Sequence, residues 1–193
     1  MKILFITTRL PWPSRDGGRV LMAATIEGLA RLGHDVAVIG PHRGPAPVVP
    51  DALAGRTTVI AVPVVPPSRA AAFARAVWSG EPYGITLHRS AAVRAAVARA
   101  LDETSFDVVH VEQAQALSQA EPAFARGLPV VLRAENVESD LWRQLAEARP
   151  AWRLVAGREA TRFARWEAAA VRRADAVVAL SEADAGRLCA LAG

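Results

Sequence analysis

The sequence of 193 residues has a single cysteine, a single lysine and no long apolar run. The lone Cys189 excludes an internal disulfide and a cysteine-rich metal site, which fits a reducing compartment. No apolar stretch is long enough to span a bilayer. The first residues also lack the basic segment and the apolar run of a secretory signal. We therefore expect a cytoplasmic protein.

Basic charge comes almost entirely from arginine, because Lys2 is the only lysine among 23 lysine and arginine residues. Two explanations are open for this bias. It can reflect genome composition, or it can mark a surface that attracts phosphates or anionic lipid. The four histidines (His34, His42, His88 and His110) show no metal-ligand spacing, so no metal site is predicted.

Apolar runs alternate with segments of helical periodicity along the whole chain. This alternation predicts a single α/β domain over residues 1–193, with a Rossmann-like, doubly wound, mostly parallel sheet and helices on both faces. Strands are predicted at 2–7, 35–39, 57–65, 107–112, 130–132 and 176–180. Helices are predicted from 18 until Gly33, at 70–78, at 91–101, from about 113, behind 130–132, at 151–173 and after 181.

Polar loops follow three of the predicted strands. The carboxyl ends of parallel strands lie at one edge of a sheet, where ligands bind in open α/β folds. We expect the strand ends at Thr7, Glu112 and Leu132 to open on one shared cleft. A dinucleotide-binding enzyme would need G-x-G-x-x-G directly after the first strand. Thr8 and Arg9 occupy that turn instead, which makes a nicotinamide or flavin enzyme the least favoured class.

The chain resembles the N-terminal domain of a family 4 glycosyltransferase with the GT-B fold. Four segments carry the resemblance in order: KILFIT with LPWPSRDGG, then FDVVHVE, then PVV with NVE, and E-x-x-x-x-R-R-A-D-A-V-V-A-L-S-E at 167–182. The resemblance implies the acceptor-binding half of a retaining, metal-independent enzyme that needs no cofactor. A second domain, covalent or in trans, would bind the nucleotide-sugar.

This resemblance implies hexosyl transfer from a nucleotide-sugar to a glycan or lipid-linked acceptor, and it leaves nucleic acid out of the expected partners. The isolated chain is expected to be inactive without its donor domain. A stand-alone, non-catalytic carbohydrate- or lipid-binding module is the alternative. For a lipid-linked acceptor, contact with the inner membrane face would be peripheral. The predicted helix at 70–78 carries Phe73, Val77 and Trp78 for such a contact, although burial of these side chains in the core is favoured.

Gly17, Gly18 and Arg19 are the first group of candidate binding residues. The two glycines lack side chains before a helix, so the backbone can approach a phosphate or sugar closely, and Arg19 can add charge. The competing interpretation is a flexible turn after Pro13.

His110 and Glu112 are the candidate catalytic residues. Because side chains alternate along a strand, both point to the same face. Family members often have a histidine at the position of Glu112. A carboxylate there could bind a sugar hydroxyl or accept the acceptor's proton, and His110 is the weaker candidate.

Arg133, Glu135, Asn136 and Glu138 form the third group, at the exit of the fifth strand. Family members commonly have His-Asn where this chain has Glu135-Asn136. Asn136 and Glu138 could bind a polyol, whereas Asn136 and Ser139 could merely cap the next helix, for which Asp140 is another candidate cap. Arg133 could form a structural ion pair with Glu135 or Glu138, or bind an anionic acceptor group.

Overall fold

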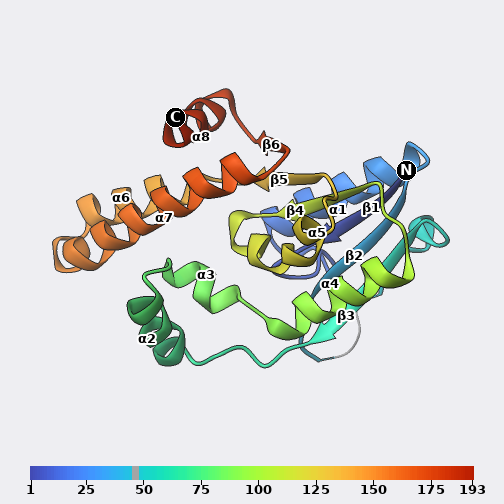
Figure 1. Ribbon diagram of the computed structural model, residues 1–193, viewed down its shortest axis with the longest axis horizontal. Helices are drawn as coiled ribbons and strands as arrows, with labels where there is room; N and C mark the ends of the chain where they lie inside the picture. The colour runs from blue at the N-terminus through green and yellow to red at the C-terminus, as the bar shows by residue number, and fades with distance from the viewer. Residues whose placement is uncertain (45–47) are drawn as a thin grey trace.

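The computed structural model describes residues 1–44 and 48–193 and contains one six-stranded, all-parallel sheet in the order β3-β2-β1-β4-β5-β6 (Figure 1). The α/β, doubly wound prediction is confirmed. The strands are β1 (Lys2–Ile6), β2 (Asp35–His42), β3 (Thr57–Pro63), β4 (Val108–Glu112), β5 (Val130–Ala134) and β6 (Ala176–Ala179). The α-helices are α1 (Gly17–Arg31), α2 (Arg69–Ser79), α3 (Tyr83–His88), α4 (Ala91–Glu103), α5 (Glu121–Ala125), α6 (Glu138–Ala148), α7 (Arg153–Arg173) and α8 (Glu182–Ala192). Short 3-10 helices are η1 (Asp51–Leu53), η2 (Ala114–Gln119) and η3 (Pro150–Trp152).

Two apolar cores lie on opposite faces of the sheet because side chains alternate along each strand. On one face α1 places Met22 and Ile26 against Phe5 of β1. On the other face α4, η2 and α5 cover the alternate positions, including Leu4 and Val111. Burial on both faces explains why these strands consist of continuous apolar runs.

α6 and α7 run side by side away from the sheet (Figure 1), and two buried carboxylates of α7 cap other helices. Glu167 accepts hydrogen bonds from the backbone N–H of Glu138 at 2.6 Å and of Ser139 at 3.2 Å, at the start of α6. Glu159 accepts one from the N–H of Tyr83 at 2.6 Å, at the start of α3. Helix N-termini leave such N–H groups without intrahelical partners, so both carboxylates satisfy buried donors.

The predicted cap of α6 is therefore wrong. The side chains of Asn136, Ser139 and Asp140 do not cap the helix, because its first N–H groups bind Glu167 instead. Two other predicted helices are shorter than expected. The segment from 113 becomes η2 followed by α5, with Pro122 in the first turn of α5, and the helix predicted from 151 begins at Arg153 after η3.

The apolar side chains of α2 are exposed, contrary to the favoured prediction of core burial. Trp78 is 93% exposed, Val77 56% and Phe73 49%, whereas the helix buries only Ala72 and Ala76. α2 packs against α3 through the side that carries these small alanines, and not through the side that carries the bulky apolar residues. A bulky apolar strip thus remains on the surface.

Candidate functional site

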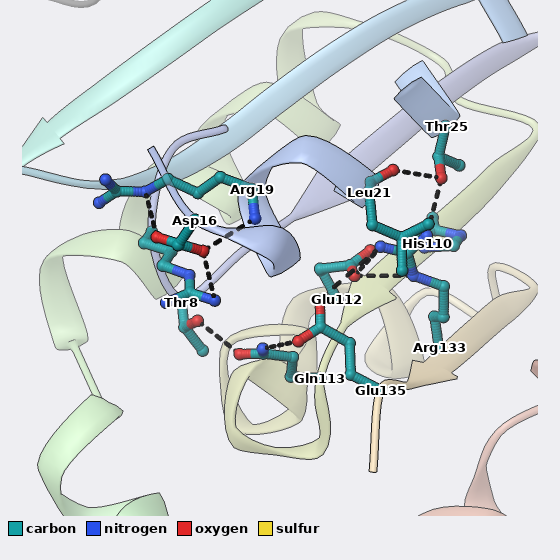
Figure 2. Close-up of polar contacts among 11 residues, drawn as sticks. Thr8, Asp16, Arg19, Leu21, Thr25, His110, Glu112, Gln113, Arg133 and Glu135 are labelled. Carbon is teal, nitrogen blue, oxygen red and sulfur yellow. Dashed lines mark hydrogen bonds and ion pairs between the residues drawn. The ribbon is translucent and has the colours of Figure 1, made fainter. Parts of the chain in front are cut away.

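The strand ends at β1, β4 and β5 lie together, as predicted, at the carboxyl edge of the sheet. Strand order reverses between β1 and β4, and ligands in open α/β folds bind in the crevice at such a reversal. The N-terminus of α1 lies at the same place, next to the ends of these strands (Figure 2). Residues at the ends of β1, β4 and β5 and at the start of α1 therefore lie close to this reversal.

Glu112 and Arg133 form a buried ion pair beneath α1 (Figure 2). Glu112 Oε1 accepts from Arg133 Nε at 2.7 Å and also from Nη2, while Glu112 Oε2 lies 3.1 Å from His110 Nε2. The remaining Arg133 nitrogen, Nη1, donates to Thr25 Oγ1 of α1 at 2.7 Å. The Glu112 side chain is 0% exposed and that of His110 is 12% exposed. His110 also stacks on Phe5, with ring centroids 4.0 Å apart.

The partner of Arg133 is thus Glu112 rather than Glu138. Glu135 is a distant second partner, with its Oε1 3.9 Å from Arg133 Nη2. His110 and Glu112 do point to one face, as their alternation predicts. Their polar atoms bind protein atoms, so the contacts of this cluster orient Arg133.

Gln113 connects three loops and was missed by the sequence analysis. Its side chain accepts from Thr8 Oγ1 at 2.9 Å and donates to Glu135 Oε2 at 2.5 Å (Figure 2). Its φ of 72° is in the left-handed region, which non-glycine residues rarely adopt and which occurs often at functional sites. The only signal in the sequence was its position directly after β4, and a lone glutamine there indicates no specific chemistry.

The Gly17-Gly18 pair forms the first residues of α1 rather than the loop before it. Asp16 caps the helix by accepting from the N–H of Arg19 at 3.1 Å. The same carboxylate pairs with Arg9 at 3.3 Å and lies 3.7 Å from Arg19 Nε. Asp16 thereby holds two arginines at the helix start, while the N–H groups of the two glycines have no acceptor within α1.

A side chain at Gly18 would disturb its neighbours, whereas one at Gly17 would not. A Cβ built at Gly18 would lie 2.5 Å from Arg9 Nη2 and 3.2 Å from both carboxylate oxygens of Glu135. At Gly17 no described atom lies within 4 Å of such a Cβ. Gly18 thus permits Arg9 and Glu135 to approach the helix start closely.

The exit of β5 separates its three polar residues. Glu135 reaches into the cluster, and its Oε1 is buried without a hydrogen-bond partner in the described residues. Asn136 is exposed. Burial raises the pKa of Glu138, and repulsion from Glu135 adds to this effect, although a hydrogen bond from Gln115 opposes it.

A cleft of about 1430 Å³ opens beside this cluster, over the ends of β1, β2 and β3. We call it the arginine cleft because its described lining includes seven arginines and two histidines but no aspartate or glutamate. These residues are Arg9, Arg15, Arg19, Arg43, Arg69, Arg75, Arg89, His42 and His88. Of the predicted site residues, Arg19 alone is in this lining. The expected cleft shared by Thr7, Glu112 and Leu132 is not the one found, because all three are buried and the described lining includes no residue of β4 or β5.

His88 lies in the arginine cleft with a lowered pKa. Burial is the larger cause, because it disfavours the charged imidazolium, and the positive charge of Arg9 lowers the pKa further. His88 is therefore neutral at neutral pH.

Two further properties concern only the described part of the chain. No three His, Cys, Asp or Glu side chains gather there in a way that could hold a metal ion. No helix within residues 1–44 or 48–193 combines the length and apolar character needed to cross a membrane.

Comparison with solved structures finds several glycosyltransferases. A kitacinnamycin glycotransferase matches 89% of this chain at 16% identity with a TM-score of 0.47. CalG4, the calicheamicin glycosyltransferase, matches 76% of this chain at 18% identity with a TM-score of 0.46. A UDP-glucosyltransferase from Polygonum tinctorium matches 77% of this chain at 13% identity with a TM-score of 0.44. The chain spans 40%, 36% and 34% of the lengths of these proteins, in that order.

At these TM-scores the structural likeness decides nothing by itself. No curated protein matches the chain. The sequence model of the glycosyl transferase 4-like domain, in contrast, matches residues 16–193, which include the start of α1, the Glu112–Arg133 pair and the part of the cleft lining from Arg19 onward. The chain belongs to the family of glycosyl transferase 4-like domains.

Proposed function

We propose that this chain is the acceptor-binding, N-terminal half of a GT-B glycosyltransferase that transfers a hexosyl group from a nucleotide-sugar to a glycan or lipid-linked acceptor. The observation that carries the proposal is the large cleft at the carboxyl edge of the sheet, in a chain of this family. Its volume exceeds the 300–1,000 Å³ or so of ordinary small-molecule pockets, which leaves room for a saccharide or the polar end of a lipid-linked acceptor.

A donor domain, covalent or in trans, would close over this edge and bring the nucleotide-sugar to the start of α1. The leaving diphosphate acquires negative charge in the transition state, and backbone N–H groups with arginine can stabilise it without a metal. Gly17 and Gly18 supply such N–H groups, and Arg19 lies beside them. These features support the metal-independent chemistry that we propose, and retention of configuration is proposed only from the resemblance to family 4.

The assignment of Glu112 and His110 as catalytic residues stays a prediction. Their contacts favour a positioning role, because the Glu112 carboxylate is fully buried and bound to Arg133 and His110. Glu135 is the better placed carboxylate for a hydroxyl group. Its Oε1 accepts no hydrogen bond from the described residues and lies near Gly18. Asn136, exposed at the same exit, and Glu138 would contact more distant parts of the acceptor.

The test compares residues 1–193 with the complete reading frame that contains them. We expect the complete protein to transfer sugar from at least one nucleotide-sugar, to retain the anomeric configuration by NMR, and to stay active in EDTA. We expect no turnover from residues 1–193. Inversion, or loss of activity in EDTA, would contradict the proposed mechanism. A complete protein that binds saccharide or lipid without any transfer would instead be a stand-alone binding module.

A further inference from the structure

The arginine cleft concentrates positive charge from separate parts of the chain. Arg9, Arg15 and Arg19 come from the segment between β1 and the first turn of α1, and Arg43 follows β2. The other three lie on or near the helices of the opposite wall: Arg69, Arg75 and Arg89. Like charges around one hollow repel each other, and low-dielectric walls strengthen the potential inside it. Water screens part of this repulsion, because Arg15, Arg43, Arg69 and Arg75 are exposed, but the excess of positive charge still attracts an anion.

Carboxylates of the protein offset only part of this charge. Asp16 pairs with Arg9 and Arg19, and Glu81 pairs with Arg89. The other four arginines form no ion pair with any described carboxylate: Arg15, Arg43, Arg69 and Arg75. The cleft thus retains a large excess of positive charge.

Three guanidinium groups also hold unused, buried donors. The Nε atoms of Arg9, Arg19 and Arg89 are buried and have no hydrogen-bond partner in the described residues. A buried donor without an acceptor costs free energy, and a small shift of these side chains would bring the donors to the acceptor oxygens of a ligand. The planar guanidinium fork matches phosphate oxygens in geometry and charge.

We propose that the arginine cleft binds the phosphate or diphosphate group of an organic acceptor. The organic body would lie on the apolar part of the same lining, which includes Leu10, Trp12 and Val64. This inference rests on the proposed function only in that it identifies the bound molecule as the acceptor. The bound chemistry, a phosphate ester with at least two negative charges, follows from the cleft.

The first test titrates the 193-residue chain with pyrophosphate, glucose 1-phosphate and glucose by calorimetry. We expect pyrophosphate and glucose 1-phosphate to bind and glucose to bind far more weakly. The double variant Arg43→Gln/Arg75→Gln removes two unpaired charges from opposite walls and should weaken pyrophosphate binding at least about tenfold. Absence of pyrophosphate binding would overturn the inference.

A matched control removes the same charge elsewhere. Arg99 of α4 and Arg158 of α7 are exposed, lie outside the cleft and form no ion pair with a described carboxylate. The double variant Arg99→Gln/Arg158→Gln should change the affinity less than about twofold, with both variants melting close to the parent chain. Equal losses in the two variants would show non-specific attraction to a basic protein and would overturn the inference.

Vesicles distinguish a lipid headgroup from a phosphorylated molecule in solution. If the phosphate is on a lipid, the chain should sediment with phosphatidylcholine vesicles that contain phosphatidic acid and not with phosphatidylcholine alone. Phe73→Ser/Trp78→Ser, on the exposed strip of α2 beside the cleft, should then abolish sedimentation but leave pyrophosphate binding unchanged. Sedimentation that survives Arg43→Gln/Arg75→Gln would contradict phosphate recognition by the cleft. Binding of glucose 1-phosphate without sedimentation assigns the cleft to a soluble phosphate.

The complete reading frame separates this inference from the proposed function. Transfer to neutral acceptors, with no gain from a phosphate on the acceptor, would overturn the inference and leave the transferase function intact. Phosphate binding in the cleft without transfer from any nucleotide-sugar would support the inference and contradict the proposed transferase function.

Discussion

Glu112 of β4 and Arg133 of β5 stand opposite each other in the register of the sheet, and their side chains form an ion pair that water does not reach. This pair fixes the ends of two neighbouring strands to each other and, through Thr25, to α1. Two charges withdrawn from water are tolerated only because each is bound by the other and by further polar atoms.

We predict that Glu112→Gln destabilises the chain by about 3–5 kcal/mol, because it leaves Arg133 as an unpaired buried charge. The double variant Glu112→Gln/Arg133→Met should recover much of this loss. Urea unfolding measures both. Asp140→Asn is the control, since Asp140 pairs with Arg187 at the surface, and its cost should be below about 1 kcal/mol. A Glu112→Gln variant as stable as Asp140→Asn would contradict the buried-charge argument.

Removing the α7 cap should also cost stability. Glu167→Ala leaves one buried and one partly buried N–H group at the start of α6 without an acceptor, which we expect to cost about 2–4 kcal/mol. Hydrogen exchange at the N–H groups of Glu138 and Ser139 should accelerate more than exchange in α1. Glu147→Ala, at an exposed position of α6, should change neither quantity appreciably. An unchanged melting temperature in Glu167→Ala would show that the carboxylate cap does not stabilise the fold.

His88 should make the chain less stable in mild acid. Its pKa in the folded chain lies below the ordinary value of 6.5, so between these two values the unfolded chain binds more protons. Stability contributed by the neutral imidazole is therefore complete above 6.5 and is lost as the pH falls through the folded pKa. His88→Gln should reduce the drop in melting temperature between about pH 7.5 and about pH 5.5. An identical drop in parent and variant would refute this assignment.

The two glycines that begin α1 offer a matched pair of substitutions. In the complete protein, Gly18→Ala should displace Arg9 and Glu135 and lower kcat/KM at least about tenfold, or about 1.4 kcal/mol in transition-state stabilisation. Gly17→Ala adds the same methyl group where no described atom lies within 4 Å, and should leave kcat/KM nearly unchanged. Melting curves should remain similar for both. Equal activity of the two variants would mean that Gly18 is only a structural residue.

Sequence alone predicted the central strands of the sheet well because they are mostly buried on both faces. β1 was predicted at 2–7 and occupies Lys2–Ile6, and β5 was predicted at 130–132 and occupies Val130–Ala134. Periodicity identifies an apolar helix face but does not say whether another element covers it. For this reason the exposure of Trp78 in α2 was not foreseen.

The candidate site was predicted only in part, because its contacts join residues that are far apart in sequence. The strand positions of Glu112 and Arg133 were foreseen, but not their ion pair, which depends on β4 and β5 being neighbours. The cap of α6 comes from Glu167, on a later helix, and no local pattern indicates it. The arginine cleft takes its lining from segments between Thr8 and Ala92, so the arginine excess of the composition was its only trace.

The two buried carboxylates of α7 have a mechanical consequence. Glu159 anchors the start of α3, which ends at His88 in the arginine cleft, and Glu167 anchors the start of α6, just after Glu135. One rigid helix therefore sets the position of a wall of the cleft and of the exit of β5 at the same time. Because both anchors belong to α7, any change in the position of this helix would disturb the wall of the cleft and the exit of β5 together.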